Sequence, residues 1–204
     1  ARFYTAKIYF TQNGIDSLIF TDVKYLQQKN GTVYPGIKED RFNTPDPEAI
    51  RYNPGANKLV WSSEGERVVK NSDTVLVDPA VIIMQPDGKH ISSFELPANL
   101  KMQVNETGPR RNGVLEGMSF GDNYKTLFVS VEEPLYEDGP RADLVENGAF
   151  IRIVKYNVNS QKSMAQYAYK LDPVAYPAVP VNGFKINGVP DILSIGNDKL
   201  LVIE

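Results

Sequence analysis

One stretch of the sequence occurs twice, and this repetition constrains the fold more than any other feature. Residues 47–67 read PEAIRYNPGANKLVWSSEGER, and residues 115–135 read LEGMSFGDNYKTLFVSVEEPL. The segments that follow also correspond, because each continues as a strand-like run, a turn and a second run ending at Leu-Pro or Leu-Asp-Pro. A chain with internal repeats builds its fold from copies of one supersecondary unit.

Two glutamates recur at matching places in this repeat. Glu48 aligns with Glu116, and Glu64 aligns with Glu132, with the same offset of 68 residues in both cases (116 − 48 and 132 − 64). A third, partial copy, PDILSIGNDKLLVIE, ends the chain.

In this third copy, Asp191 occupies the first acidic position and Glu204 the second. A shorter turn between them reduces their spacing from 16 residues to 13 (64 − 48 against 204 − 191).

The local pattern predicts strands throughout. Short runs rich in Val, Ile, Tyr, Phe and Thr alternate with clusters of Gly, Asn, Asp and Pro, and helical periodicity is nearly absent. Segments such as QPDGK and GDNYK have the composition of hairpin turns. We therefore predict an antiparallel all-β protein with strands in residues 2–10, 17–26, 58–64, 80–85, 90–96, 126–132, 150–158, 164–171 and 199–204.

The repeating unit reads as strand A, hairpin, strand B, longer loop, strand C, hairpin and strand D. Four antiparallel strands at this period are typical of a β-propeller blade. The predicted units are the C and D strands of one blade (1–42), a blade (43–110), a second blade (111–180) and the A and B strands of another (181–204). A β-sandwich is the alternative, because regular short strands and turns suit it as well.

An incomplete propeller is expected from this count of units. The chain begins at Ala1 with a strand-like run instead of a start Met or signal peptide, so we expect an upstream segment outside it. Unpaired strand edges invite pairing. A missing segment or a partner chain is therefore expected to cover them.

Composition excludes several function classes. The 22 Lys and Arg against 25 Asp and Glu give a formal net charge of −3, without a basic run, which argues against a nucleic-acid partner. The absence of Cys excludes disulfides, thiolate metal ligands and a Cys nucleophile. No apolar run approaches the roughly 18 residues of a membrane helix.

The repeat places its acidic residues on one face. Strand A begins at the end of the blade where strand B stops, so six carboxylates should gather near the mouth of the central channel. These predicted metal ligands are Glu48, Glu64, Glu116, Glu132, Asp191 and Glu204. Like charges raise one another's pKa, and a hard cation offsets that repulsion, because Ca²⁺ prefers six to eight oxygen ligands.

Calcium or magnesium is the predicted metal, since a chain with no Cys and one His is a poor zinc ligand. Such a cation polarises a phosphate ester and activates water. Glu116 and Glu132 are the candidate catalytic residues, and Arg67 and Arg111 the candidate phosphate ligands. The alternative is a structural role, in which strand-end glutamates accept backbone N–H bonds.

The segment GMSFG matches the G-x-S-x-G pattern of serine hydrolases, with Ser119 as its serine. That pattern needs a strand-to-helix turn and a histidine that follows the serine in an α/β-hydrolase. The single histidine, His90, precedes Ser119 and falls at a predicted hairpin. We therefore interpret Ser119 as an inner-strand residue.

The chain resembles a known family of bacterial propellers, the phytase-like family with "esterase-like activity of phytase". The resemblance is carried by PDPEAIRY, SSEGER, RRNGVLEGMSF, TLFVSVEEPL, IRIVKY, QYAYKLD and the terminal LLVIE. It implies a secreted or periplasmic protein that hydrolyses phosphate esters or related esters. The family usually has Glu at the place of Asp191 and Arg after the residue corresponding to Glu204.

Two other functions fit the same pattern. One is a propeller without catalysis that binds a glycan, a peptide or a protein. The other is a lactonase-like propeller that holds calcium with central carboxylates, which lactone substrates would distinguish from a phosphoesterase.

Overall fold

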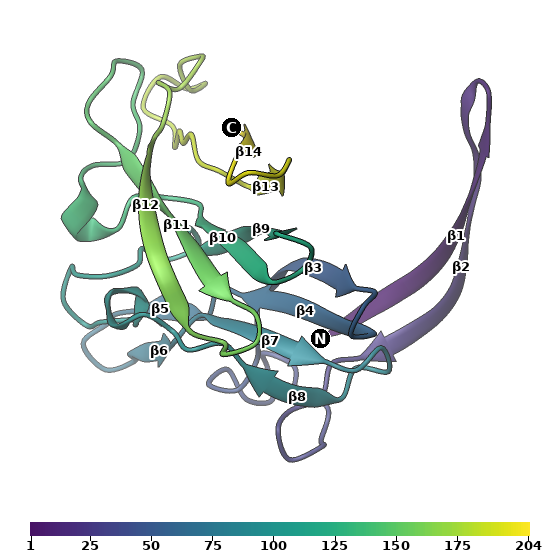
Figure 1. Cartoon of the computed structure of the whole chain (residues 1–204). Coiled ribbons are helices and arrows are strands. Elements are labelled where there is room, and N and C mark those ends of the chain that lie inside the picture. Colours follow the sequence, from purple (N-terminus) through teal and green to yellow (C-terminus); the bar gives the residue numbers. More distant parts are fainter.

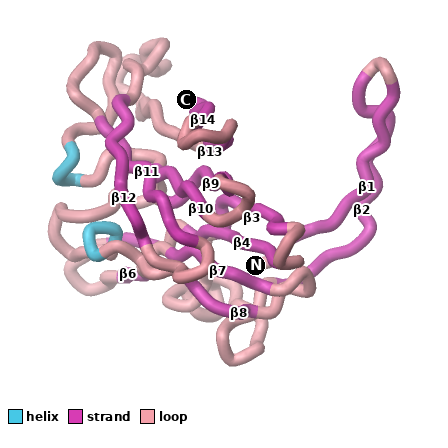
Figure 2. The backbone as a smooth tube through the Cα atoms, viewed as in Figure 1, coloured by secondary structure: helices cyan, strands magenta, loops and turns pink.

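The computed structural model describes all 204 residues, and its regular secondary structure is almost entirely β-strand, joined by long loops (Figure 2). The only helical segments are two 3-10 turns, η1 (Ala98–Leu100) and η2 (Tyr136–Asp138). Neither could cross a membrane. The predicted all-β class is therefore confirmed.

Two four-stranded antiparallel sheets form the body of the molecule (Figure 1). The first has the order β3 (Pro47–Asn53), β4 (Lys58–Ser63), β7 (Ala80–Met84) and β8 (His90–Ser93). The second has the order β9 (Leu115–Gly121), β10 (Thr126–Val131), β11 (Phe150–Asn157) and β12 (Ser163–Lys170). In both sheets each strand pairs with the next strand of its repeat.

Three two-stranded sheets complete the fold, and no sheet closes on itself. They are β1 (Arg2–Thr11) with β2 (Gly14–Tyr25), β5 (Glu66–Val68) with β6 (Val75–Val77), and β13 (Asp191–Ser194) with β14 (Leu200–Ile203). The β5–β6 pair lies in a segment expected to be loop. Strands of three residues are too short for an alternating pattern to reveal them.

The two copies of the repeat have the same strand register. Ile50 pairs with Trp61, and 68 residues later Met118 pairs with Val129. The register of both hairpins is interrupted at the same place, near the start of the first strand. The internal repeat therefore fixes strand pairing as well as strand order.

A serine supports each interruption. The Ala49 N–H donates to Ser62 Oγ at 3.0 Å, and the Gly117 N–H donates to Ser130 Oγ at 3.0 Å. A bulge of this kind re-aims the side chains beside it. The third copy has Val202 at the serine position, and the β13–β14 pair has no interruption.

Apolar cores lie between successive sheets. The largest packs residues of the first sheet, such as Val60 and Val81, against residues of the second, such as Met118 and Leu127. A second core joins the second sheet to Ile192 of β13. The third surrounds the buried Trp61 of the first sheet, with Leu26 and Tyr34 beside it.

Strand β9 lies between β3 and β13. A side chain at Gly117 would approach within 2.8 Å of the Cα of Asp191, so glycine is what allows β13 to lie this close. The first strands of three units are thus neighbours.

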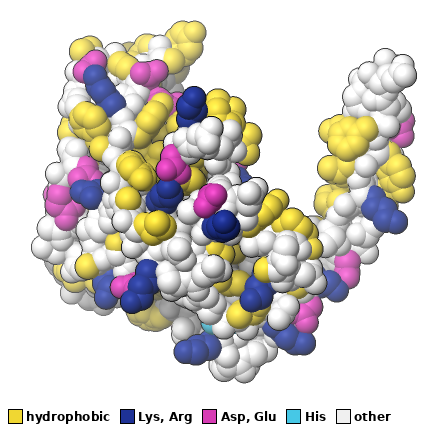
Figure 3. Space-filling model, in the orientation of Figure 1, with side chains coloured by type: hydrophobic (Ala, Val, Ile, Leu, Met, Phe, Trp, Pro, Cys, Tyr) yellow, Lys and Arg dark blue, Asp and Glu magenta, His cyan; other side chains and the backbone are white.

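The β1–β2 hairpin projects from this body (Figure 1) and carries apolar side chains on its surface (Figure 3). Tyr4, Phe10, Ile15 and Phe20 are each more than half exposed. An isolated two-stranded hairpin is marginally stable. Further strands that pair with this hairpin and cover its apolar side chains would therefore stabilise it.

We predict that Ser130→Ala destabilises the protein through the bulge of β9. The substitution leaves the buried N–H of Gly117 without its acceptor, which should lower the free energy of unfolding by about 1–3 kcal/mol. Urea denaturation followed by circular dichroism measures this change. Ser160→Ala, in an exposed turn, is the matched control and should stay within about 0.5 kcal/mol of the unchanged protein. Equal effects of the two substitutions would contradict the role given to the bulge serine.

Candidate carboxylate site

Four of the predicted acidic residues come together at one end of the two main sheets. Glu48 lies in β3 and Glu116 in β9, while Glu64 and Glu132 directly follow β4 and β10. Oxygens of Glu64, Glu116 and Glu132 lie within 4.8 Å of one another.

Glu64 also belongs to a second group of the same size, together with Glu48 and Asp46. Asp46 was absent from the sequence prediction because it precedes the repeat. Its position two residues before Glu48 is the feature of the sequence that could have identified it as a member of the cluster.

Glu64 is the most deeply buried member of the group, with 4% of its surface exposed. One oxygen, Oε1, accepts the backbone N–H of Val114 at 2.7 Å, from the segment that leads into β9. Burial raises the pKa of Glu64, and the backbone N–H groups of Val114 and Gly113 oppose the rise. The carboxylate therefore joins the first sheet to the segment that leads into the second.

The other three glutamates accept no hydrogen bond from the protein. Burial raises the pKa of Glu116 to about 8, and repulsion from Glu48 and Glu132 adds to the effect. Burial likewise raises the pKa values of Glu48 and Glu132 to about 7, with Glu64 as the largest electrostatic contributor to both. Of the three, only Glu132 has a nearby positive charge that lowers its pKa, the guanidinium of Arg141.

Glu133 has a different environment from its neighbour Glu132. It is 1% exposed and accepts a hydrogen bond from Arg141 Nε at 2.6 Å. Gly113 packs against it so closely that a Cβ there would lie 2.6 Å from Glu133 Cγ. The Glu133–Arg141 pair anchors the loop after β10 beside the cluster, and sequence reasoning did not identify it.

Asp191 and Glu204 lie outside the two acidic groups. Asp191 forms an ion pair with Arg51 of β3 at 2.5 Å. Glu204 accepts hydrogen bonds from Tyr169 Oη at 2.5 Å and from Asn187 Nδ2 at 2.8 Å. β13 lacks the bulge of β3 and β9. Asp191 is therefore not directed into the acidic cluster as Glu48 and Glu116 are.

Neither candidate arginine contacts the carboxylates. The guanidinium of Arg67 donates to the carbonyl oxygens of Gln103, Val104 and Asn105 and lies over the ring of Tyr136. Arg111 forms a bidentate ion pair with Glu66, in which Nε donates to Oε1 at 2.8 Å and Nη2 donates to Oε2 at 3.3 Å.

The donor set of the cluster fits a hard divalent cation. It offers only carboxylate oxygens, and three of its side chains have no protein donor to satisfy them. Ca²⁺ takes six to eight oxygen ligands in loose geometry. Glu64 is buried, Glu116 and Glu132 are half-buried, and Glu48 is exposed. Buried charges are normally paired or bound to metal, so the inner carboxyls of the cluster favour protons or a cation.

Ser119 has no catalytic partner. It is 4% exposed in β9, and its Oγ accepts the backbone N–H of Ser194 at 2.8 Å. The ring of His90 lies beside Ser93, 3.3 Å away. Ser119 is thus a buried strand residue of β9.

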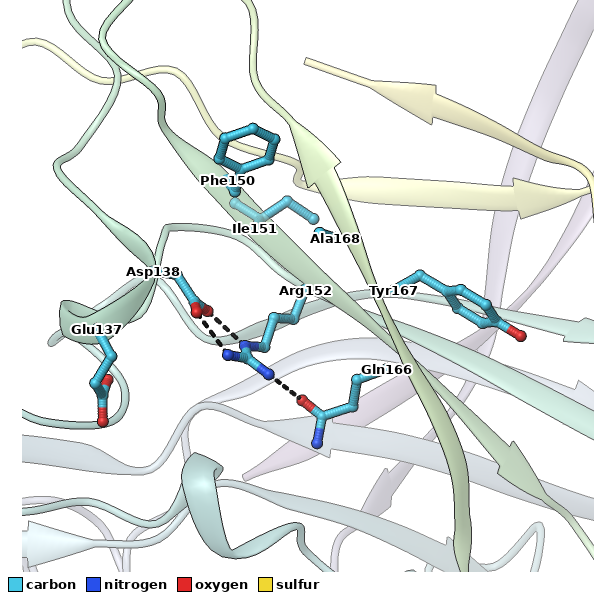
Figure 4. A pocket seen from close by; sticks show the side chains of 8 residues that line it. All are labelled: Glu137, Asp138, Phe150, Ile151, Arg152, Gln166, Tyr167 and Ala168. Carbon is cyan, nitrogen blue, oxygen red and sulfur yellow. Dashed lines mark hydrogen bonds and ion pairs between the residues drawn. The ribbon is translucent and has the colours of Figure 1, made fainter.

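A separate cavity of about 520 Å³ lies against β11, β12 and η2, and none of the four glutamates lines it. Figure 4 shows Arg152 at its centre, bonded to Asp138 and Gln166. Asn99 also exchanges hydrogen bonds with Gln166. The ionic groups of this cavity are thus paired within the protein.

Comparison with curated proteins finds no match to this chain. A family model described as "Phytase-like: Esterase-like activity of phytase" matches residues 1–204, and the chain therefore belongs to this family.

Proposed function

We propose that the acidic groups at the ends of β3, β4, β9 and β10 bind a divalent cation, Ca²⁺ first of all. We further propose that this centre hydrolyses a phosphate ester or a related ester. The observation that carries the proposal is the set of three glutamates, Glu48, Glu116 and Glu132, that cluster around Glu64 without a hydrogen-bond donor. The description of the family supports the esterase class.

The cluster is also where a propeller would have the mouth of its channel. The sheets pack face to face through the cores described above, and β3, β9 and β13 are neighbours, as inner strands of successive blades would be. The proposed architecture is therefore an incomplete propeller. A missing segment or a partner chain would pair with the free edges of β1 and β14. The family resemblance extends the proposal to a secreted or periplasmic bacterial protein.

A cation bound here would polarise the ester and lower the pKa of a bound water. The protein contributes carboxyl groups that exchange protons near neutral pH, since the pKa of Glu116 is about 8 and that of Glu132 about 7. Arg111, with a side chain 56% exposed, is the arginine best placed to exchange its contact with Glu66 for a phosphate. Arg67 would have to release three carbonyl oxygens.

A second candidate function is cation binding without hydrolysis, in a propeller that binds a ligand or a protein. The observation that favours it is that both arginines are held in contacts away from the cluster. Stabilisation by Ca²⁺ without turnover of phosphate esters, carboxylate esters or lactones would select this alternative. Turnover of lactones alone would select the lactonase-like reading.

We predict that Ca²⁺ stabilises the protein through Glu116 and Glu132. At a concentration 100 times the Kd, a bound ligand adds about 2.7 kcal/mol, which corresponds to a rise in Tm of roughly 5–10 °C for a chain of this size. Glu116→Gln combined with Glu132→Gln should abolish the rise, because amides replace two charged ligands. Differential scanning fluorimetry with EDTA and with Ca²⁺ measures it.

The matched control is Glu106→Gln combined with Asp16→Asn, two exposed residues outside both acidic groups. This control should keep the full rise in Tm. Persistence of the rise in the Glu116–Glu132 variant would refute the cation site.

We predict metal-dependent hydrolysis at the same residues. Release of phosphate from p-nitrophenyl phosphate and from myo-inositol hexakisphosphate should require Ca²⁺ or Mg²⁺, and should fall by roughly 100-fold or more in the Glu116–Glu132 variant. The control pair should keep its rate. An unchanged rate in the variant would show that hydrolysis does not depend on Glu116 and Glu132.

We predict that the cluster destabilises the metal-free protein as pH rises. The pKa values of Glu48, Glu116 and Glu132 are raised above 4.5 in the folded state, so their favourable contribution is complete below pH 4.5 and is lost as pH rises toward 8. In EDTA the Glu116–Glu132 variant should match the unchanged protein near pH 4.5. At pH 8 it should exceed it by about 1–3 kcal/mol, a value reduced for the partial exposure of these groups.

Denaturant titrations at the two pH values measure this difference. A variant that loses stability relative to the unchanged protein at pH 8 would show that the carboxylates are favourably compensated without metal.

A further inference from the structure

A cavity of about 520 Å³ lies beside the acidic cluster, between residues 37–46 and the β5–β6 pair. Asp46, which forms an acidic group with Glu48 and Glu64, is part of its wall. An oxygen of Asp46 lies within 4.8 Å of an oxygen of Glu64, and Glu64 belongs to both acidic groups. The cavity therefore adjoins the centre that we propose for catalysis.

Gly65 connects the cluster to the opposite wall of the cavity. It follows Glu64 directly and lines the cavity, and β5 begins one residue later. Its φ is +76°, and a Cβ at this position would lie 2.1 Å from the carbonyl oxygen of Val77 in β6. Glycine is therefore what allows the chain to turn from the buried carboxylate into the cavity wall within one residue.

Both walls of the cavity carry apolar side chains. Ile37 and Pro45 belong to the first wall, and Val68 and Val75 belong to the β5–β6 pair. Thr44 also lines the cavity, but its hydroxyl donates to a backbone carbonyl oxygen at 2.7 Å. Cavities of this size that bind small molecules typically combine apolar walls with a few polar groups that fix orientation.

The charged side chains of the wall are paired, with one exception. Arg41 forms an ion pair with Asp73, and Glu66 accepts hydrogen bonds from Arg111 at 2.8 and 3.3 Å. Asp46 has no such partner, and burial and the charge of Glu66 both raise the pKa of its carboxyl group. The cavity therefore offers no free cation, and a polyanion placed in it would meet a negatively charged wall.

We infer that this cavity binds an uncharged apolar group, aryl or branched alkyl, of the ester that the carboxylate centre hydrolyses. The inference rests on the proposed function for the reaction and on the cavity alone for the group that is bound. In that reaction water adds to phosphorus, the P–O bond to the apolar group breaks, and the departing oxygen takes up a proton from the water. An apolar alcohol or phenol and phosphate are released. The preferred substrates are therefore esters with an apolar leaving group, and polyanions such as myo-inositol hexakisphosphate are disfavoured.

The first test is binding of 2-naphthol to the full chain in EDTA, followed by saturation-transfer NMR, because it requires neither a metal nor turnover. Ile37 is 64% exposed, so Ile37→Ser removes an apolar side chain from the cavity wall without opening the core. This variant should bind 2-naphthol roughly fivefold more weakly or worse. Ile15→Ser is the matched control, because Ile15 is 67% exposed on the β1–β2 hairpin, and it should bind as the unchanged protein does.

The second test compares kcat/KM for 2-naphthyl phosphate and for myo-inositol hexakisphosphate in the presence of Ca²⁺. The naphthyl ester should have the higher value by roughly tenfold or more. Ile37→Ser should lower the value for the naphthyl ester and leave that for the inositol ester unchanged. This selective loss separates recognition of the apolar group from the intrinsic reactivity of the two substrates.

Three outcomes would overturn the inference. One is the absence of 2-naphthol binding at about 3 mM, where a Kd near 1 mM would be evident. Another is binding that Ile37→Ser leaves unchanged, which would place the naphthol elsewhere. The third is hydrolysis of myo-inositol hexakisphosphate at least as efficient as that of the naphthyl ester, which would leave the proposed function intact. Binding of 2-naphthol without hydrolysis of any ester would instead refute the proposed function and uphold the cavity as a site for an apolar group.

Discussion

The buried carboxylate of Glu64 is the constraint on which the rest of the site depends. It follows β4 of the first sheet and accepts the Val114 N–H from the chain that enters the second, so it holds the two sheets together across their core. The backbone N–H groups of Val114 and Gly113 do not compensate a charge on a residue that is 4% exposed, because burial still raises its pKa. The carboxyl group at this junction is therefore a fixed feature of the fold, and Glu48, Glu116 and Glu132 are arranged around it.

Protons and a cation compete for the same oxygens in such an arrangement. Without a cation, repulsion and burial keep the glutamates partly protonated near neutral pH, because their pKa values reach about 7 and 8. A divalent cation displaces those protons. In the proposed cation complex, the repulsion that the fold accepts by crowding the carboxylates would be relieved by the bound ion.

The sequence predicted the features that depend on the repeat and missed those that depend on contacts between distant segments. Register and the gathering of four glutamates follow from one offset of 68 residues. The third copy was predicted to behave like the first two, but Val202 replaces the bulge serine and Asp191 pairs with Arg51. The repeated serine is visible in the sequence. Its support of the bulge became evident only from the hydrogen bonds that it accepts from Ala49 and Gly117.

No repeated residue in the sequence predicts the contacts of Arg67 and Arg111. Arg67 is held by three carbonyl oxygens some forty residues away in the chain, and no periodic pattern encodes this. The same distinction separates the two ends of the β9–β10 hairpin. At its open end the bulge repeats and the carboxylates repeat with it, whereas the turn end differs in every copy: NPGANK, GDNYK and GNDK. The repeat therefore predicts the open end of each hairpin, whereas the turn end has to be read separately in each copy.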